Sequence, residues 1–322
     1  MSNLLRCAAA AIALTLFAAG VQAQSKYPNR PIRLLTPFAA GGGSDVLARR
    51  IGGPLTEVLG QQIVVDNRPG GGGTLGAGIV ARAEPDGYTL IVVSGSYGAS
   101  GATHDLPYDV ATGITPIILI GTTPLVLTVH PKTPLKSVKE FIDYAKANPG
   151  KLNIASAGVG TLDHLAGEYF KLQTGAGYTI VPYKGSGPAM TALISGEVSG
   201  SMTTLVTSIP HAKAGRLRPI GVTTAKRSRA MPDLPSISET VPGYDVVHWY
   251  GMWGPKGLPK SIVTLWNREV AKVLRTSENE KWLADQGLER AGGPPEEFAN
   301  RLKVDDARWK KVVKEARLSV KQ

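Results

Sequence analysis

Thiols are almost absent from this 322-residue chain, whose single cysteine is Cys7. Because Cys7 lies in an N-terminal segment of the kind removed on export, the mature protein would have no disulfide, no cysteine metal ligand and no thiol nucleophile. An exported protein of this size that relies on its hydrophobic core alone is more typical of a bacterial periplasm than of a eukaryotic secretory pathway. Its length is enough for two domains of ordinary size.

The N-terminal segment has the three parts of a signal peptide. Arg6 supplies positive charge, residues 8–19 form an apolar run too short to cross a bilayer comfortably, and Ala23 ends a stretch of small residues. We expect cleavage near Ala23, so that residues 1–23 are removed and a periplasmic protein begins at Gln24. The alternative is an uncleaved anchor, but no later apolar run in the sequence is long enough to span a membrane.

Aromatic residues are also scarce, at 6% of the chain, although the formal net charge is +11. A positive surplus favours anionic partners. Nucleic acid is not expected as a partner, because the basic residues are scattered and no binding motif interleaves them with aromatics. One dense basic cluster fits the solvated face of a last helix. Its members are Arg308, Lys310, Lys311, Lys314 and Arg317.

The sequence lacks the motifs of hydrolases and nucleotide-binding proteins. No serine stands in a G-x-S-x-G elbow, and no Gly-Lys-Ser/Thr follows a glycine-rich loop. Residues 71–76 have the dinucleotide spacing G-x-G-x-x-G, but no acidic residue ends the next predicted strand, where Val93 is followed by Ser94. We interpret this glycine run as a turn that packs closely on its neighbours.

A metal site has only a partial signal. His164 and Glu168 stand four residues apart on a predicted helix, a spacing that could place two ligands on one face. A zinc site needs a third ligand, and no H-E-x-x-H motif suggests one. We therefore expect no metal, no cofactor and no catalytic residue.

Strand and helix patterns alternate along the chain, which predicts an α/β fold with mainly parallel sheets. Gly52-Gly53-Pro54 predicts a kink or break in the first helix, residues 45–59. The apolar stretch 114–129 is interrupted by Gly121 and Pro124, and reads as two strands with a crossing between domains. Strands are predicted at 32–35, 62–65, 89–93, 152–155, 179–182, 202–205, 217–222 and 249–253. The remaining predicted helices are one ending at Arg82 and those at 137–147, 162–173, 188–195, 262–274 and 295–316.

The middle of the chain has its own strand–helix alternation, bracketed by two strands that could act as hinges. We therefore predict a discontinuous first lobe, made of residues 24–124 and 222–322, and a second lobe made of residues 125–221. The C-terminal helices would belong to the first lobe. No repeat of fixed period appears.

The most informative loop runs from Pro37 to Asp45, where a strand leads through glycines into a helix. Free backbone N–H groups and the positive end of the helix dipole meet there, which makes a place for an anion. The glycines at 41–43 let a ligand approach the backbone, and Ser44 could donate a hydroxyl. Asp45 would be an N-cap or a brace of the loop. An ordinary tight turn would look the same.

Two further loops repeat this pattern, at residues 156–161 and 182–187. Three such loops at the carboxyl ends of strands, spread over two domains, are what a cleft between two α/β lobes requires. Together with export and the missing nucleotide motifs, they indicate a receptor that captures a small carboxylate rather than an enzyme.

Several sequence blocks resemble the tripartite tricarboxylate transporter substrate-binding proteins, also called Bug-type receptors. The resemblance covers essentially the whole mature chain. Its blocks are Pro37-Phe38 with Gly41-Gly42 and Asp45, then Asn67–Gly70, Pro85–Leu90, Leu106–Asp109, Ala145–Leu152, Gly160–Glu168, Val181–Gly185 and Pro295–Phe298.

The resemblance implies a two-lobed periplasmic-binding-protein fold, the type II-like Venus flytrap, which closes about a hinge on an organic acid. It implies a monomer without a cofactor that delivers its ligand to a two-component membrane permease. The residues expected at the ligand are Phe38, Gly41, Gly42, Gly43, Ser44, Asp45 and Ser94 from the first lobe, and Ser156, Gly158, Thr161, Lys184 and Gly185 from the second.

Two alternatives remain open at the level of sequence. One is a secreted hydrolase on the same scaffold that uses His164 and Ser156. The other is a sensory receptor that presents its liganded form to a membrane partner, which needs the same cleft as a transport receptor. The identity of the acid is not encoded in any motif.

Overall fold

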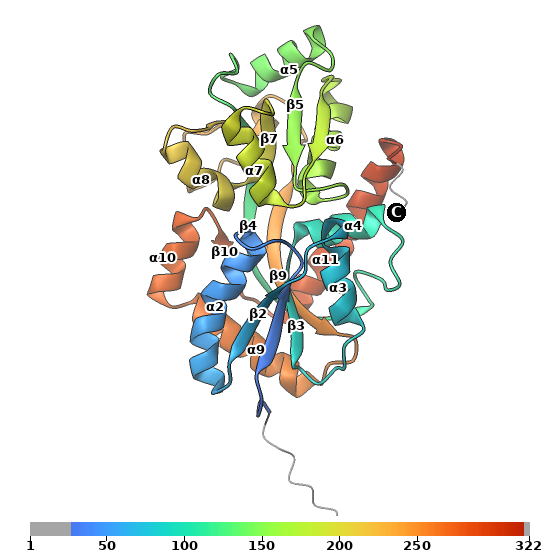
Figure 1. Ribbon diagram of the computed structural model, residues 1–322, viewed down its shortest axis with the longest axis vertical. Helices are drawn as coiled ribbons and strands as arrows, with labels where there is room; N and C mark the ends of the chain where they lie inside the picture. Colours follow the sequence, from blue (N-terminus) through green and yellow to red (C-terminus); the bar gives the residue numbers. More distant parts are fainter. Residues whose placement is uncertain (1–26, 319–322) are drawn as a thin grey trace, which may run out of the picture.

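The computed structural model describes residues 27–318, so the predicted signal peptide lies outside the described residues. Two α/β lobes are stacked along the long axis of the molecule (Figure 1). The strands are β1 (Ile32–Thr36), β2 (Ile63–Asn67), β3 (Thr89–Ser94), β4 (Ile114–Val129), β5 (Asn153–Ser156), β6 (Thr179–Pro182), β7 (Gly200–Thr204), β8 (Arg218–Val222), β9 (Val247–Pro255) and β10 (Glu289–Arg290). The helices are α2 (Gly43–Leu59), α3 (Thr74–Ala81), α4 (Gly95–Thr103), α5 (Val138–Ala147), α6 (Leu162–Thr174), α7 (Ser186–Ser195), α8 (Leu205–Lys213), α9 (Lys260–Leu274), α10 (Ser277–Asp285) and α11 (Pro295–Glu315), with 3₁₀ turns η1 (Gly71–Gly73) and η2 (Ile237–Glu239).

One path of strands runs through both lobes, in the order β2-β1-β3-β9-β4-β7-β5-β6, and β8 and β10 pair with β4 beside this path. Within each lobe the pairs that carry the helices are parallel: β1 with β2 and β3, and β5 with β6 and β7. The α/β prediction with mainly parallel pairing in each lobe is thus confirmed.

The apolar stretch 114–129 is a single strand and not two. Residues up to Pro124 pair with β9, and residues from Leu125 pair with β7, so β4 leaves one lobe and enters the other within one step of the chain. The register shifts between Leu119 and Gly121, so the strand accommodates Gly121 at an irregularity, whereas Pro124 pairs with Val247 in regular register. The register supports a boundary near residue 125, and the full division of the chain into lobes stays a prediction.

The break predicted in the first helix is also absent. α2 continues through Pro54 to Leu59. Gly53 makes this possible, because the helical conformation is disfavoured before proline mainly for residues that carry a Cβ atom. Gly52 lies on the buried face, where an added Cβ would be 3.5 Å from the Ile63 side chain. Neither glycine marks a kink, since α2 is continuous through Pro54 and a Cβ at Gly52 would be at ordinary contact distance from Ile63.

Three observed helices were not predicted from the sequence, namely α4, α8 and α10. The most consequential is α4, whose sequence GSYGASGAT contains three glycines and would not form a stable helix alone. Its residues from Gly95 to Ser100 are all buried. Packing against α6 and α11 thus imposes the helix, and small residues are needed because the neighbouring elements approach so closely.

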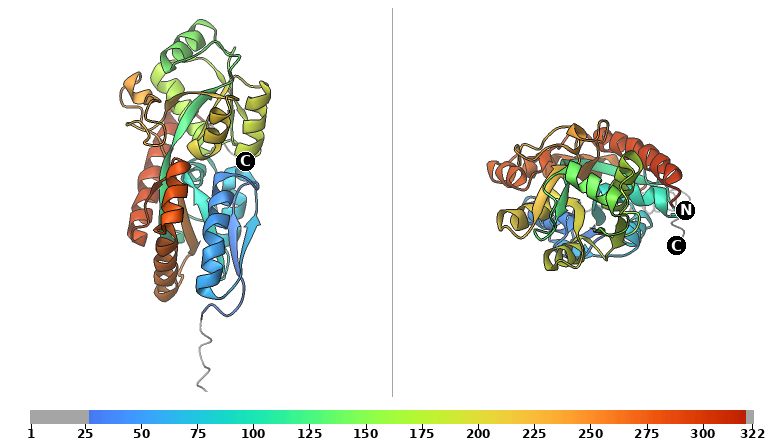
Figure 2. Two further views of the ribbon diagram at one scale, coloured as in Figure 1. Left: turned by 90° about the vertical axis from the view of Figure 1, so that its left-hand side faces the viewer. Right: turned by 90° about the horizontal axis from the view of Figure 1, so that it is seen from above.

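Separate cores fill the two lobes, and α11 contributes to both. Phe298 and Leu302 pack with Trp249 and other residues of the first lobe. About two turns after Leu302, Trp309 packs in the core around Phe141 in the second lobe. In Figure 2, the red α11 lies along one side of the molecule, beside the junction of the lobes. This helix therefore ties the lobes together away from the strands.

We predict that α4 tolerates a methyl group at one glycine and not at another. An added Cβ at Gly101 would lie 2.5 Å from a Val110 methyl group, whereas at Gly98 its nearest neighbour would be 3.5 Å away. Gly101→Ala should therefore lower the free energy of unfolding by about 1–3 kcal/mol through overpacking. Gly98→Ala should be neutral or stabilising by up to about 1 kcal/mol, because Ala favours helix. Urea denaturation of both variants measures the difference, and equal effects would contradict the packing of α4.

Candidate ligand-binding site

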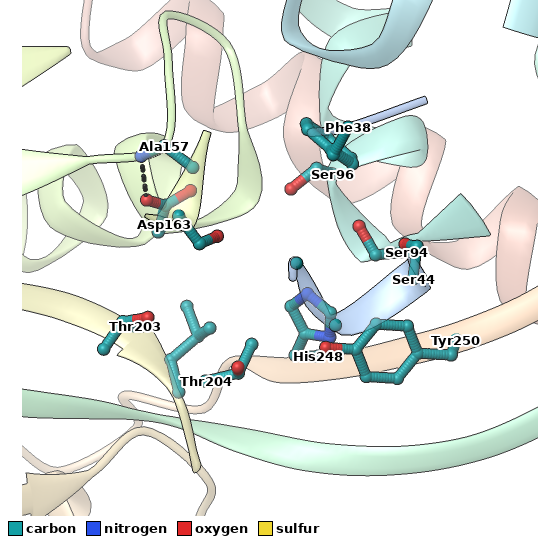
Figure 3. A pocket seen from close by; sticks show the side chains of 14 residues that line it. Phe38, Ser44, Ser94, Ser96, Ala157, Asp163, Thr203, Thr204, His248 and Tyr250 are labelled. Carbon is teal, nitrogen blue, oxygen red and sulfur yellow. Dashed lines mark hydrogen bonds between the residues drawn. The ribbon is translucent and has the colours of Figure 1, made fainter. Parts of the chain in front are cut away.

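A cavity lies between the two lobes, at the point where β4 passes from one to the other. It encloses about 440 Å³ of space free of protein atoms, part of which is open to solvent. Its walls come from both lobes, and its floor comes from the connecting strands (Figure 3). The lining residues are Phe38, Gly42, Gly43, Ser44, Ser94, Ser96, Leu125, Ala157, Asp163, Ser186, Thr203, Thr204, His248 and Tyr250.

The first-lobe wall is the loop between β1 and α2, together with the start of α4. Gly43 has no room for a side chain, because an added Cβ would overlap the hydroxyl group of Tyr250. Ser44 is 2% exposed and its Oγ has no hydrogen-bond partner among the described residues. Phe38, Ser94 and Ser96 lie beside it in Figure 3. A buried hydroxyl without a partner is costly, so this wall is built to be completed by something that enters the cavity.

Asp45 braces this loop and does not line the cavity. Its side chain is 5% exposed, and its carboxylate accepts hydrogen bonds from Gly41 N at 2.9 Å, Asn67 Nδ2 at 3.0 Å and Arg49 Nε at 3.0 Å. Burial alone would raise the pKa of Asp45, but these hydrogen bonds outweigh it and hold that pKa below its ordinary value. The ionised carboxylate therefore fixes the shape of the glycine loop from behind.

The second-lobe wall comes from three loops, at the starts of α6, α7 and α8. Asp163, in the first turn of α6, accepts a hydrogen bond from the backbone N–H of Ala157 (Figure 3). Burial raises the pKa of Asp163, opposed by hydrogen bonds from Thr161 and from backbone N–H groups of its own loop. Its carboxylate thus already occupies the donors at the N-terminus of α6.

Five helices begin at the cavity: α2 and α4 from the first lobe, and α6, α7 and α8 from the second. Their N-cap residues are Gly42, Ser94, Thr161, Gly185 and Thr204, and none of these side chains forms a cap hydrogen bond. The lining contains no Lys or Arg. Because Asp163 occupies the donors at the start of α6, the positive potential of this cavity comes from the helix dipoles and backbone N–H groups of the other four helices, which is the environment that binds an anion.

The floor is formed by His248 and Tyr250 on β9 and by Leu125 on β4. The His248 ring is 4% exposed, and burial lowers the pKa of His248 to about 3, so the imidazole is neutral. Its centroid is 4.8 Å from that of the Tyr250 ring, at an interplanar angle of 53°. Burial likewise raises the pKa of Tyr250, which keeps the phenol protonated.

Five residues expected at the ligand lie in the lining: Phe38, Gly42, Gly43, Ser44 and Ser94. Seven lie outside it, and for these a direct contact stays a prediction. Gly41 N donates a hydrogen bond to the Asp45 carboxylate, and Thr161 Oγ1 donates one of 2.6 Å to Gly158 O. Ser156 is buried and its Oγ has no partner among the described residues. The N–H of Gly185 donates to Ala157 O, and Lys184 is exposed.

Nine lining residues were not foreseen. The predicted loops 156–161 and 182–187 contain Ala157 and Ser186, and Asp163 follows the first of them by two residues. The loop pattern therefore located these three residues to within a few positions. Thr203 and Thr204 end β7 just before α8, and the missing prediction of α8 hid them. Ser96, Leu125, His248 and Tyr250 had no local signal, because a strand or a buried helix start carries no glycine-rich loop. They are lining residues only because the lobes meet there.

The family model for the tripartite tricarboxylate transporter family receptor matches residues 47–318, so this chain belongs to that family. Protein BugT of Bordetella pertussis (strain Tohama I) is 34% identical over 100% of this chain and 99% of its own length.

Two solved structures from Rhodopseudomonas palustris are similar over nearly the whole chain. Rpa4515, solved with adipate, is 38% identical with a TM-score of 0.88, over 92% of this chain and 100% of that one. MatC (Rpa3494), solved with bound malate, is 33% identical with a TM-score of 0.84, over 89% and 100%. The family and these similarities confirm the two-lobed periplasmic-binding-protein fold and the function of a solute-binding receptor.

We predict that Asp45→Asn destabilises the protein by about 1–3 kcal/mol at neutral pH, because it removes the charged acceptor of three hydrogen bonds. The pKa of Asp45 is lower in the folded state than its ordinary value of 3.8. The ionised group therefore stabilises the fold above that value, and this contribution is lost as the pH falls through the folded-state pKa. Urea denaturation of both proteins from pH 7 downward should show the difference narrowing below pH 3.8. A difference independent of pH would contradict the brace.

Proposed function

We propose that this chain is a periplasmic receptor that captures a small organic acid between its lobes and delivers it to the membrane permease of a tripartite transporter. The observation that carries the proposal is the convergence of the N-termini of α2, α4, α7 and α8 on one cavity whose lining contains no Lys or Arg. Backbone N–H groups held in fixed directions bind a carboxylate through hydrogen bonds and helix dipoles, with no need for a basic side chain.

Lobe closure follows from how the donors are divided. The starts of α2 and α4 belong to the first lobe, and those of α7 and α8 belong to the second. An acid that forms hydrogen bonds with both sets binds the closed arrangement more tightly than the open one. This difference in affinity shifts the equilibrium between open and closed lobes towards the closed state. Across the cavity, Ser96 Oγ already accepts a hydrogen bond from Leu162 N at 3.2 Å, so the two lobes also contact each other directly.

The related structures with adipate and malate support a carboxylate as the ligand class. Cleavage of the chain near Ala23, a monomeric receptor and a permease as partner belong to the same proposal. Within the described residues, none of the helices combines the length and apolar character needed to cross a bilayer.

A receptor without catalytic activity is part of the proposal. In the hydrolase alternative, His164 would have to serve as a base, but its Nδ1 is 3.2 Å from the backbone N of Gly160 and accepts its hydrogen bond. Burial lowers the pKa of His164. His164 is therefore explained as a support of the β5–α6 loop, and it lies outside the cavity lining.

We predict that Ser44→Ala weakens binding of the tightest-binding organic acid about tenfold and leaves thermal stability unchanged. The Ser44 hydroxyl lacks a protein partner, so its removal costs the ligand a hydrogen bond and costs the fold little. Lys184→Ala is the comparison variant, since Lys184 was predicted at the ligand from the sequence but is exposed and outside the lining, so its removal should leave binding unchanged. Calorimetric titration of both variants with adipate, malate and shorter acids measures the effects. If no acid binds the wild-type protein, or if only Lys184→Ala weakens binding, this location of the site is wrong.

A further inference from the structure

His248 is a buried polar group that the anion site does not explain. It lies on the floor of the cavity, at the start of β9, where its backbone pairs with Thr123 of β4 (Figure 3). The ring is 4% exposed and its Nδ1 has no hydrogen-bond partner among the described residues. An orphaned buried nitrogen is unfavourable unless a ligand or an ordered water completes it.

None of the neighbouring polar side chains bonds to His248 in the structure. The hydroxyl groups of Thr203 and Thr204 lie 2.7 Å and 3.1 Å from the hydroxyl of Thr207. On the other side, the Tyr250 ring packs against the His248 ring. Because His248 lines the cavity, a ligand there lies beside an imidazole whose Nδ1 has no partner among the described residues.

The chemistry of this position differs from that of the helix N-termini. Fully buried, the imidazole is neutral, so one ring nitrogen donates a hydrogen bond and the other accepts one. A second carboxylate would find no cationic side chain there, since Asp163 is the only other lining residue with an ionisable acid or base group besides Tyr250. A ligand hydroxyl both donates and accepts, so it satisfies a neutral imidazole in either tautomer.

We propose that His248 determines specificity by hydrogen bonding to a hydroxyl group of the ligand, so that this receptor prefers hydroxy acids to acids of equal length without the hydroxyl. The inference deepens the proposed function and rests on it. Each end of the acid would still be held by helix N-termini, and the hydroxyl between them would face the floor.

His248 lies on the strand pair that connects the lobes. β9 pairs with β4 along its length, with His248 opposite Thr123, and with β3 from Tyr250 onwards. The imidazole is therefore held by a strand and not by any of the glycine-rich loops. A site that hydrogen-bonds a ligand hydroxyl discriminates against the analogue that lacks it, because the polar group is then left unpaired.

The test measures affinities for matched pairs of acids by calorimetric titration of the mature protein. The pairs are lactate and propionate, malate and succinate, 2-hydroxyglutarate and glutarate, and 2-hydroxyadipate and adipate. For the pair that binds best, the wild-type protein should bind the hydroxy acid about tenfold more tightly. His248→Phe keeps a ring against Tyr250 and removes both nitrogens, and it should reduce this preference to within twofold. His248→Asn keeps a donor and an acceptor near Nδ1, and it should retain part of the preference.

The outcomes separate the inference from the proposed function. If the acids bind but the wild-type protein shows no preference within pairs, or if His248→Phe weakens both members equally, the specificity role is refuted and the receptor function stands. If no acid of any pair binds, the proposed function is refuted and the inference falls with it.

A ring-nitrogen measurement covers the case in which His248→Phe fails to fold. The ¹⁵N resonances of His248, assigned by comparison with His248→Asn, should shift on saturation with the hydroxy acid. They should shift much less with the acid of equal length that lacks the hydroxyl group. Equal shifts with both acids would refute the specificity role.

Discussion

The antiparallel pairing of β4 with β9 and with β7 sets the direction of every other strand in the molecule. β3 and β4 both run antiparallel to β9, so they point the same way, from the first lobe towards the second. β7 runs antiparallel to β4 and therefore points back towards the first lobe. β1 is parallel to β3, and β5 is parallel to β7. The carboxyl ends of the parallel strands in the two lobes therefore face each other.

From that arrangement the electrostatics of the site follow directly. Each of these strands is succeeded by a helix, and a helix that begins at the carboxyl end of a strand directs its N-terminus at the same edge. Opposed edges bring five such N-termini to one cavity. The protein thus attracts an anion with backbone dipoles, while its carboxylates are used as braces. Asp45 holds the first-lobe loop from behind, and Asp163 holds the second-lobe loop from within.

The sequence located most elements because their patterns are local. The glycine loop before α2, the helix from Ser137 with Glu140 three residues later, and the short strand β6 were all predicted close to their observed bounds. Ser137 caps its helix, with Glu140 N donating to Ser137 Oγ at 3.1 Å, and the Glu140 carboxylate accepts a hydrogen bond from Lys136 N. Predictions failed where the environment overrides propensity, as in glycine-rich α4, or where a glycine compensates a proline, as in α2.

By itself, the sequence determined the α/β class and, through its motif blocks, the receptor family, and it predicted glycine loops that bind an anion. These depend on periodicity, chain turns and short-range hydrogen bonds, which neighbouring residues dictate. Only the tertiary structure decided which side chains line the cavity. His248 and Tyr250 reach it from a strand that lies far along the chain from the loops, whereas the predicted Lys184 is exposed and is not among the lining residues. Such positions depend on how strands of two lobes pair, and no local pattern records that pairing.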